Sequence, residues 1–287
     1  MIDRNDPVES ALPSELFPRS KAHRSTPLEA LPAHDEFSTS TRALETASIV
    51  AALVLLMLLM VRCLPLIMSH PASLLVWILG VVAADFGSGM IHWFADTWGH
   101  ETMPILGRRL LRPFRVHHLN PDDFLRRDFI DCNGDVALLQ IPILALALFL
   151  MDRVSWGGAL GTFCMGLCGV GMFTNQFHQW AHQRSPAPII RWLQRRGVVL
   201  SRAQHRLHHR QPHQKAYCIT TGWCNTPLEK IGFFSRLERL ITRWTGRQPR
   251  ADYLEFISRH PVGHRKRCRG RVNLDGTYLA PSGQEGG

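Results

Sequence analysis

Residues 44–61 read LETASIVAALVLLMLLMV, an apolar run with one charged residue, Glu45, at its edge. Three further runs of the same kind follow at residues 72–91, 136–151 and 158–177. The only charge in these three runs is Asp85. The four runs contain 18, 20, 16 and 20 residues. Because a helix rises ~1.5 Å per residue and the hydrocarbon core of a bilayer is ~30 Å thick, they predict four transmembrane helices, the third of them short.

The alternative to a membrane protein is a soluble bundle of four buried helices. Soluble core helices usually keep a polar stripe, which these runs almost entirely lack. We therefore expect an all-α integral membrane protein with about four transmembrane helices and a cytoplasmic, His-rich helical cap. Residues 43–255 form the predicted membrane domain. Residues 1–42 are interpreted as a disordered tail, and residues 256–287 as a basic, then Gly/Ser-rich disordered tail.

The basic residues indicate how the helices are oriented. The chain carries 33 Lys and Arg against 23 Asp and Glu, a net charge of +10. Only Arg62 and Arg153 lie in the turns after the first and third runs, whereas the N-terminal tail, the middle segment and the segment after the fourth run hold 5, 6 and 20 basic residues. The positive-inside rule places those three segments in the cytoplasm. The positive charge is therefore explained by the cytoplasmic segments of a membrane protein. Because the sequence contains no nucleic-acid-binding motif, we expect no nucleic-acid partner.

Histidine is the other abundant residue, with 15 in the chain. Most of them gather at the predicted cytoplasmic ends of the second and fourth runs and in the segments that follow these runs. They are His92, His100, His117, His118, His178, His182, His205, His208, His209 and His213. The orientation predicted from charge alone places all of them on one membrane face. Such a concentration predicts a metal centre.

The spacing of the histidines supports metal binding, because residues three or four apart share one helix face and can bind one ion. Three sets have this spacing: His178 with His182, His205 with His208 and His209, and His92 with Asp96, which His100 could extend. Each set has a simpler interpretation. A lone His100 or His213 is more often a surface residue or a partner of a ligand, and basic residues with histidines near a membrane can form a lipid-binding patch.

Adjacent His117 and His118 point about 100° apart on a helix. They would therefore bind two different metal ions, or one would be a ligand and the other would hold a ligand in place. One metal needs only three or four side chains, so eight histidines in four clusters can supply two ions. Imidazole binds iron, zinc and copper, while the seven Cys form no C-x-x-C pair for a thiolate zinc site. A dinuclear, imidazole-rich centre favours iron and oxygen chemistry.

Two other polar residues lie beside the clusters. Asp85 is seven residues before His92, on the same helix face and ~10 Å deeper in the bilayer. A carboxylate there is a candidate to orient a ligand or substrate, and a structural hydrogen bond to a neighbouring helix explains it equally well. Asn175 is three residues before His178 and could be a weak ligand, support a ligand, or bond to another helix.

Several stretches resemble the Kua/CarF family of membrane lipid desaturases. They are ADFGSGMIHWFADTWG at 84–99, RPFRVHHLNP at 112–121, DFIDCNGD at 128–135, FTNQFHQWAH at 173–182, HRLHH at 205–209 and CITTGWCNTPLEKIGFFSRLERLI at 218–241. Two of them contain the H-x-x-x-H and H-x-x-H-H boxes of the wider membrane desaturases and hydroxylases. The family includes animal and bacterial plasmanylethanolamine desaturases and a plant plastid desaturase that acts on phosphatidylglycerol.

The resemblance implies a fatty-acid-desaturase-like fold in which two iron ions (Fe2+/Fe3+) use O2 to dehydrogenate a lipid. The implied substrate is a 1-O-alkyl ether phospholipid in the membrane, and the implied product is the vinyl ether of a plasmalogen. The family's metal-binding positions carry over to His92, His117, His118, His178, His182, His205, His208 and His209. His213 and Asp96 also lie in family motifs. Gln204 stands where relatives carry a further His.

Electrons would come from an external donor, a cytochrome b5-like protein or a ferredoxin, because the sequence has no flavin, haem or Fe–S motif. The basic cytoplasmic surface would dock such an acidic carrier. The length and terminal extensions resemble bacterial members, which implies a multi-pass protein of the bacterial inner membrane with both termini cytoplasmic. Three alternatives remain open: an acyl-chain desaturase or hydroxylase with the same centre, a zinc hydrolase, and a non-catalytic membrane signalling protein.

Overall fold

The computed structural model describes residues 38–125, 127–210 and 213–259, which form helices and irregular connections without a strand. The predicted all-α class is therefore confirmed. The helices are α1 (Thr39–Ser69), α2 (Ser73–Thr97), the π-helix η2 (Gly107–Leu111), α3 (Arg112–Leu119), α4 (Pro121–Phe124), α5 (Phe129–Leu150), α6 (Gly157–Gly171), α7 (Thr174–His182), α8 (Pro188–Arg195), α9 (Arg202–His208), α10 (Asn225–Lys230), α11 (Phe233–Thr245) and α12 (Ala251–Arg259).

The ends of the predicted membrane domain need adjustment. Helix α1 begins at Thr39, so the last residues of the predicted tail 1–42 are helical. Helix α12 continues to Arg259, past the start of the predicted tail 256–287, because Phe256 packs on α3. The rest of both predicted tails lies outside the described residues.

In the part of the chain that the structure describes, four helical segments are long and apolar enough to cross a membrane: Thr39–Ser69, Ser73–Thr97, Phe129–Leu150 and Gly157–His182. Each coincides with one predicted run. The fourth segment is divided, because the chain turns at Met172 and Phe173 between α6 and α7. Large apolar side chains on α1, α2 and α5 point outward and are exposed, among them Val54, Leu75 and Leu139. An outward apolar surface of this kind suits contact with lipid.

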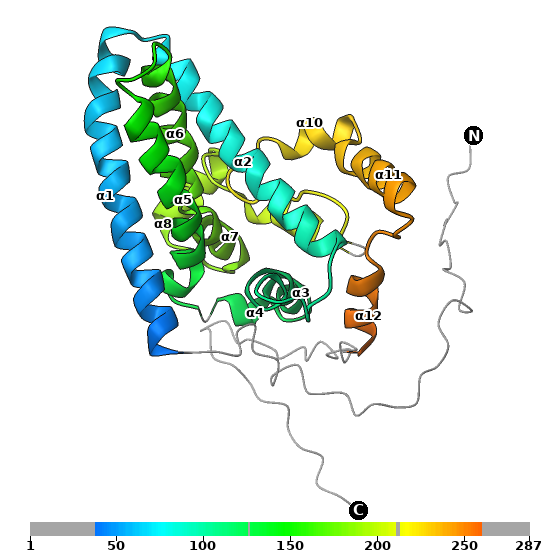
Figure 1. The fold of residues 1–287 in the computed structure, drawn as a ribbon. Coiled ribbons are helices and arrows are strands. Elements are labelled where there is room, and N and C mark those ends of the chain that lie inside the picture. The colour runs from blue at the N-terminus through cyan, green and yellow to red at the C-terminus, as the bar shows by residue number, and fades with distance from the viewer. Residues whose placement is uncertain (1–37, 126, 211–212, 260–287) are drawn as a thin grey trace, which may run out of the picture.

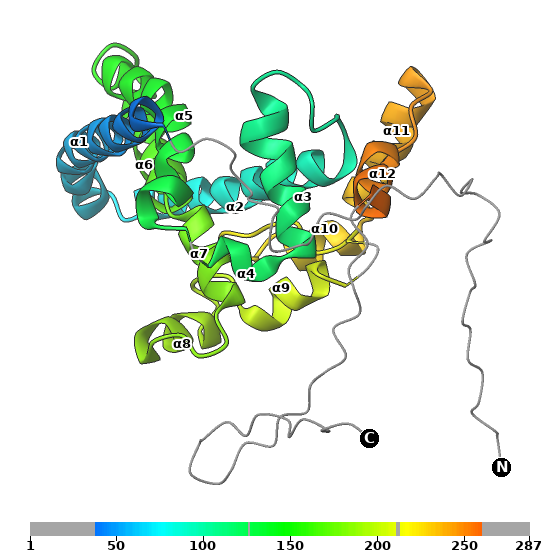
Figure 2. The same ribbon diagram turned by 90° about the horizontal axis from the view of Figure 1, so that it is seen from below.

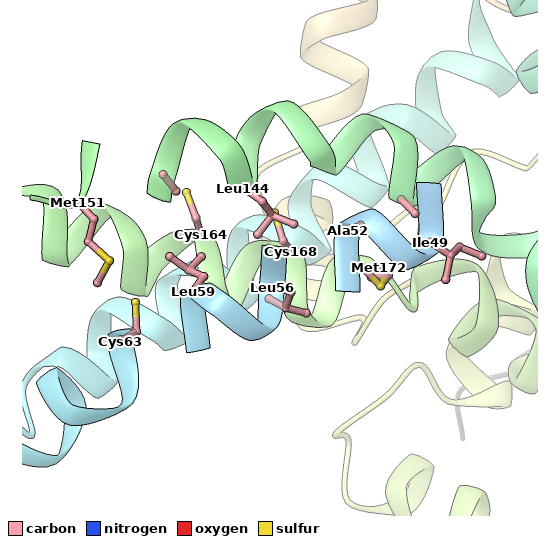
Figure 3. Close-up of a cluster of buried hydrophobic side chains, with 12 residues drawn as sticks. Ile49, Ala52, Leu56, Leu59, Cys63, Leu144, Met151, Cys164, Cys168 and Met172 are labelled. Atoms are coloured by element: carbon pink, nitrogen blue, oxygen red, sulfur yellow. The ribbon is translucent and has the colours of Figure 1, made fainter. Parts of the chain in front are cut away.

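The bundle is held together along α1, α5 and α6, which stand side by side, while α2 packs along α6 at a slant (Figure 1). Small and medium apolar side chains such as Ala52, Leu56 and Leu144 fill the space between them (Figure 3). At one end Arg42 of α1 donates two hydrogen bonds, of 2.8 and 2.6 Å, to the carboxylate of Asp128, the residue that caps α5. This bidentate pair aligns the starts of α1 and α5.

Glycines let α2 and α6 touch through their backbones. A Cβ atom added at Gly80 would lie 2.1 Å from the carbonyl oxygen of Phe163, and one at Gly166 would lie 2.2 Å from that of Trp77. The glycines of the fourth run therefore serve close helix packing.

Replacing one of these glycines should separate the two helices. We expect Gly166→Ala to lower the free energy of unfolding by about 1–3 kcal/mol, because the methyl group overpacks the contact. The matched control is Gly87→Ala in α2, where the new Cβ would meet nothing within 4 Å. That change should be neutral or stabilise the protein by up to about 1 kcal/mol. Thermal unfolding in detergent measures both, and equal melting temperatures would contradict the packing.

An irregular loop between α9 and α10 is bound to α2 at the level of Asp85. The two carboxylate oxygens of Asp85 accept hydrogen bonds from the backbone N–H groups of Thr221 and Gly222, both at 2.8 Å, and of Cys224 at 2.9 Å. Irregular backbone at membrane depth requires such internal partners. We considered two roles for Asp85: orienting a ligand or substrate, and forming a structural hydrogen bond to a neighbouring helix. The contacts are those of a structural acceptor, but the donors lie in a loop and not in a helix.

Candidate metal centre

One end of the bundle gathers α3, α4, α7 and α9 around the end of α2, as the view along the bundle shows (Figure 2). Helices α2, α3, α7 and α9 carry all eight histidines predicted as ligands, His209 being the residue that ends α9. Six of the eight are buried, and His182 and His209 are half-buried. Side chains far apart in the sequence therefore meet in one shielded place.

The first group of side chains that could hold a metal ion consists of five histidines. They are His117, His178, His182, His205 and His209. The Nε2 atom of His205 lies at the centre, 2.6 Å from Nε2 of His182, 2.9 Å from that of His209 and 3.0 Å from that of His178. The Nε2 atom of His117 completes the group at 3.0 Å from that of His209.

The second group combines three histidines with a carboxylate: His92, Asp96, His118 and His208. The Nε2 atoms of His118 and His208 are 2.8 Å apart. Oδ2 of Asp96 lies 3.4 Å from Nε2 of His92 and 3.5 Å from Nε2 of His208. Asp96 is thus a member of the second group, together with three of the predicted histidine ligands.

The two groups divide neighbouring residues between them. His117 belongs to the first group and His118 to the second. Of the two interpretations left open for these adjacent histidines, this placement favours the one in which they serve two metals. The set of His205, His208 and His209 is also divided, because His208 faces the second group. The prediction that these three share one ion therefore needs correction. Within each group the candidate ligand atoms all lie within 4.8 Å of one another, close to the ~4 Å that opposite ligands span around an ion bound at ~2 Å.

The chemistry of the second group fits a bound cation. Both carboxylate oxygens of Asp96 and Nε2 of His92 are buried without a hydrogen-bond partner in the described part of the chain. A buried carboxylate without donors carries a large desolvation cost unless a positive charge compensates it. A metal ion among these atoms would supply that charge and use the free lone pair of His92.

The histidines outside the membrane-spanning segments are held uncharged. Burial, reinforced by the neighbouring histidines, lowers the pKa of His117, His118, His205 and His208 well below the usual value. Burial lowers the pKa of His209 to about 2. A neutral imidazole keeps the lone pair that a metal requires.

These pKa shifts make the stability of the metal-free protein depend on pH. The unfolded chain takes up protons below the ordinary histidine pKa of 6.5, whereas folded His209 resists protonation down to about 2. The unfolded state therefore binds more protons as the pH falls below 6.5, and each such histidine removes about 1.4 kcal/mol of stability per pH unit. We expect the melting temperature of the metal-free protein to fall steadily from pH 7 to pH 5. A flat profile would contradict the buried, neutral histidines.

The remaining predicted residues lie around the groups rather than in them. Helix α2 ends at Thr97, so His100 does not extend the face of Asp96, and its Nδ1 instead lies 2.7 Å from the Thr102 hydroxyl. His100 belongs to a separate, more exposed group with Asp252 and Glu255. Asn175 donates a 2.6 Å hydrogen bond to the carbonyl oxygen of Cys132, so it links α7 to α5 as a structural residue.

His213 lies behind His118, with the two rings parallel within 5° and their centroids 4.5 Å apart. Its Nδ1 is 2.8 Å from the hydroxyl of Tyr253, which is also 3.0 Å from Nδ1 of His118. Burial raises the pKa of Tyr253, so the phenol keeps its proton. Sequence patterns did not single out Tyr253, because it stands alone in a short helix with no spacing relation to the histidines.

A helical bundle suited to a membrane, with two adjacent histidine-rich groups at one end that could each hold a metal ion, is the architecture expected of a membrane metalloprotein. Comparison with known families narrows this class. The chain belongs to the lipid desaturase domain family, whose model matches residues 81–252 and so includes both groups of candidate ligands. The recognition made from the sequence motifs is therefore confirmed.

Known proteins agree with this family. The chain is 42% identical over 222 residues to the plasmanylethanolamine desaturase of Myxococcus xanthus, covering 75% of this chain and 77% of that protein. It is 44% identical over 196 residues to plasmanylethanolamine desaturase 1 of Mus musculus, covering 63% and 71%. It is 36% identical over 177 residues to the chloroplastic fatty acid desaturase 4 of Arabidopsis thaliana, covering 60% and 52%. No solved structure matches the chain.

Proposed function

We propose that this chain is a plasmanylethanolamine desaturase, which uses O2 and two iron ions to convert the alkyl chain of a 1-O-alkyl ether phospholipid into the vinyl ether of a plasmalogen. The observation that carries the proposal is the 42% and 44% identity to proteins of that name. The reaction removes two hydrogen atoms from adjacent carbons. With O2, two electrons and two protons, it yields the alkene and two molecules of water.

The residues of the site suit this reaction. Bound iron would supply the oxidant that an unactivated C–H bond requires, which no side chain provides. The neutral histidines and the carboxylate of Asp96 would hold the two ions in the two groups already described. Burial keeps bulk water away from both groups, and the apolar outer surfaces of α1, α2 and α5 let a lipid chain approach from the bilayer.

Orientation and the electron donor belong to the same proposal. The distribution of basic residues supports a cytoplasmic position for the metal centre and both termini. The similarity to a protein of Myxococcus xanthus favours the inner membrane of a bacterium as the location. Helix α11 and the residues after it present Arg236, Arg239, Arg243 and Arg247 to the exterior. Such a basic surface would attract an acidic carrier, a cytochrome b5-like protein or a ferredoxin.

Lipid mass spectrometry tests the function. Expression of the chain in cells that contain 1-O-alkyl phospholipids but no plasmalogens should produce acid-labile vinyl-ether lipids only when O2 is present. The relative in Arabidopsis, named a fatty acid desaturase, favours acyl-chain desaturation as the second candidate. A new acyl double bond without a vinyl ether would support that candidate and contradict the first. An acid-stable hydroxylated lipid would indicate a hydroxylase.

A further inference from the structure

We propose that Tyr253, together with His213, positions His118 for metal binding by fixing which ring nitrogen of His118 carries the proton. Tyr253 is the residue directly after the segment that matches the family model, 81–252. The inference rests on the metal centre of the proposed function. It concerns how one ligand of the second group is oriented.

Two histidines of the second group are oriented by backbone carbonyls. Nδ1 of His92 donates to the carbonyl oxygen of Tyr217 at 3.1 Å, and Nδ1 of His208 donates to that of Lys215 at 2.9 Å. A carbonyl oxygen only accepts hydrogen bonds, so both Nδ1 atoms must carry the proton. Both Nε2 atoms therefore present a lone pair to the site.

Among the described residues, no backbone carbonyl accepts a hydrogen bond from Nδ1 of His118. Its Nδ1 faces the hydroxyl of Tyr253 at 3.0 Å, and a hydroxyl can donate or accept. If Tyr253 accepts from Nδ1, then Nε2 of His118, which is 2.8 Å from Nε2 of His208, is free to bind a cation. If Tyr253 donates to Nδ1, the proton moves to Nε2 and blocks that position. The direction of this one hydrogen bond therefore decides whether His118 can be a ligand.

His213 sets the direction. The hydroxyl of Tyr253 has one proton, and Nδ1 of His213 lies 2.8 Å away on its other side. When Nδ1 of His213 accepts that proton, Tyr253 can only accept from His118. His213 and Tyr253 are 5% and 2% exposed, so water does not replace either partner.

His213 is itself held in place. Its carbonyl oxygen accepts a 3.1 Å hydrogen bond from the hydroxyl of Tyr217, which in turn accepts one of 2.9 Å from Arg250. His213 adopts a left-handed backbone conformation, with φ at 57°. Tyr253 is held by α12, whose Phe256 packs on Val116 of α3, two residues before His118. The elements on both sides of Tyr253 are thus fixed relative to His118.

The test is a Co2+ titration of the full-length, metal-stripped protein in detergent, followed by visible absorbance in competition with a chelator. The unchanged protein should bind two ions. Tyr253→Phe removes only the hydroxyl, and it should weaken one of the two sites by about 10- to 100-fold while leaving the other unchanged. The matched control is Leu254→Ala on the exposed face of the same helix, which should leave the affinities of both sites unchanged.

A second pair of variants covers the case in which Tyr253→Phe does not fold. Asn tolerates the left-handed conformation and places an amide oxygen near the position of Nδ1, so His213→Asn should keep both sites. His213→Leu offers no acceptor and should weaken the same site as Tyr253→Phe.

The inference would be overturned if Tyr253→Phe left the affinities of both sites as they are in the unchanged protein, or if the two His213 variants behaved alike. A selective loss of one site in Leu254→Ala would overturn it as well. If the unchanged protein failed to bind two ions, the metal centre of the proposed function would fall, and this inference with it. Two-site binding without vinyl-ether formation would overturn the proposed reaction alone.

Discussion

Replacing His205 with Ala is expected to lower the rate of vinyl-ether formation by at least about 100-fold. Removing a residue that only supports a ligand costs up to about 100-fold in activity, and the loss of a ligand itself should cost at least as much. Nε2 of His205 lies within 3.0 Å of three other imidazoles, so the first group loses its centre. Vinyl-ether lipid per amount of protein, and iron per chain, measure the effect. Iron content should fall from two ions toward one.

The control for His205→Ala is His70→Ala. His70 is an exposed histidine that ends α1, far along the chain from the clusters. Its replacement should leave both the lipid product and the iron content unchanged. Activity of His205→Ala within a few-fold of the unchanged protein would rule out the first group as a metal site.

Asp96→Asn is expected to produce the second large effect, with opposite consequences for activity and stability. The amide keeps the shape of the side chain but removes the only carboxylate of the second group. Activity should fall by about 100-fold or more because the second ion is lost. The metal-free protein should become more stable, because the variant removes a buried carboxylate that has no hydrogen-bond partner among the described residues.

The control for this prediction is Asp152→Asn. Asp152 forms an exposed ion pair with Arg62 outside the metal centre. Exposed pairs contribute about 0–1 kcal/mol, so little change in stability or activity should follow. If metal-free Asp96→Asn melted below the unchanged protein, Asp96 would be a structural residue rather than a candidate metal ligand.

The sequence predicted the helices well because their lengths and composition are local properties. Each of the four helical segments that could cross a membrane, among the described residues, coincides with an apolar run of the sequence. The break at Met172 and Phe173 was missed, because both residues are apolar and nothing in the pattern marks a turn. Helix boundaries were less accurate for the same reason.

The sequence predicted which histidines come together at the candidate site, but not how they are divided between the two groups. Spacing along a helix places His178 beside His182, and this the structure shows. It does not reveal that His208 turns away from His205 and His209, since that depends on where α2 and α3 lie relative to α9. The role of the eight histidines as ligands stays a prediction.

Contacts that join distant segments could not be predicted at all. The chain carries no local sign that Asp85 bonds to a loop more than a hundred residues later, or that Tyr253 lies against His118. Such contacts depend on the three-dimensional path of the chain, and only a set of related sequences or a structure can supply them.

The link between Asp85 and the loop at 221–224 has a consequence for biosynthesis. Helix α2 leaves the ribosome long before this loop is made, so it must enter the membrane with a carboxylate that has not yet met its three N–H donors. The nascent protein therefore carries an unmet polar group until translation passes Cys224. A chain that stops before this point can still pack α2 on α6, but the Asp85 carboxylate then lacks all three of these donors.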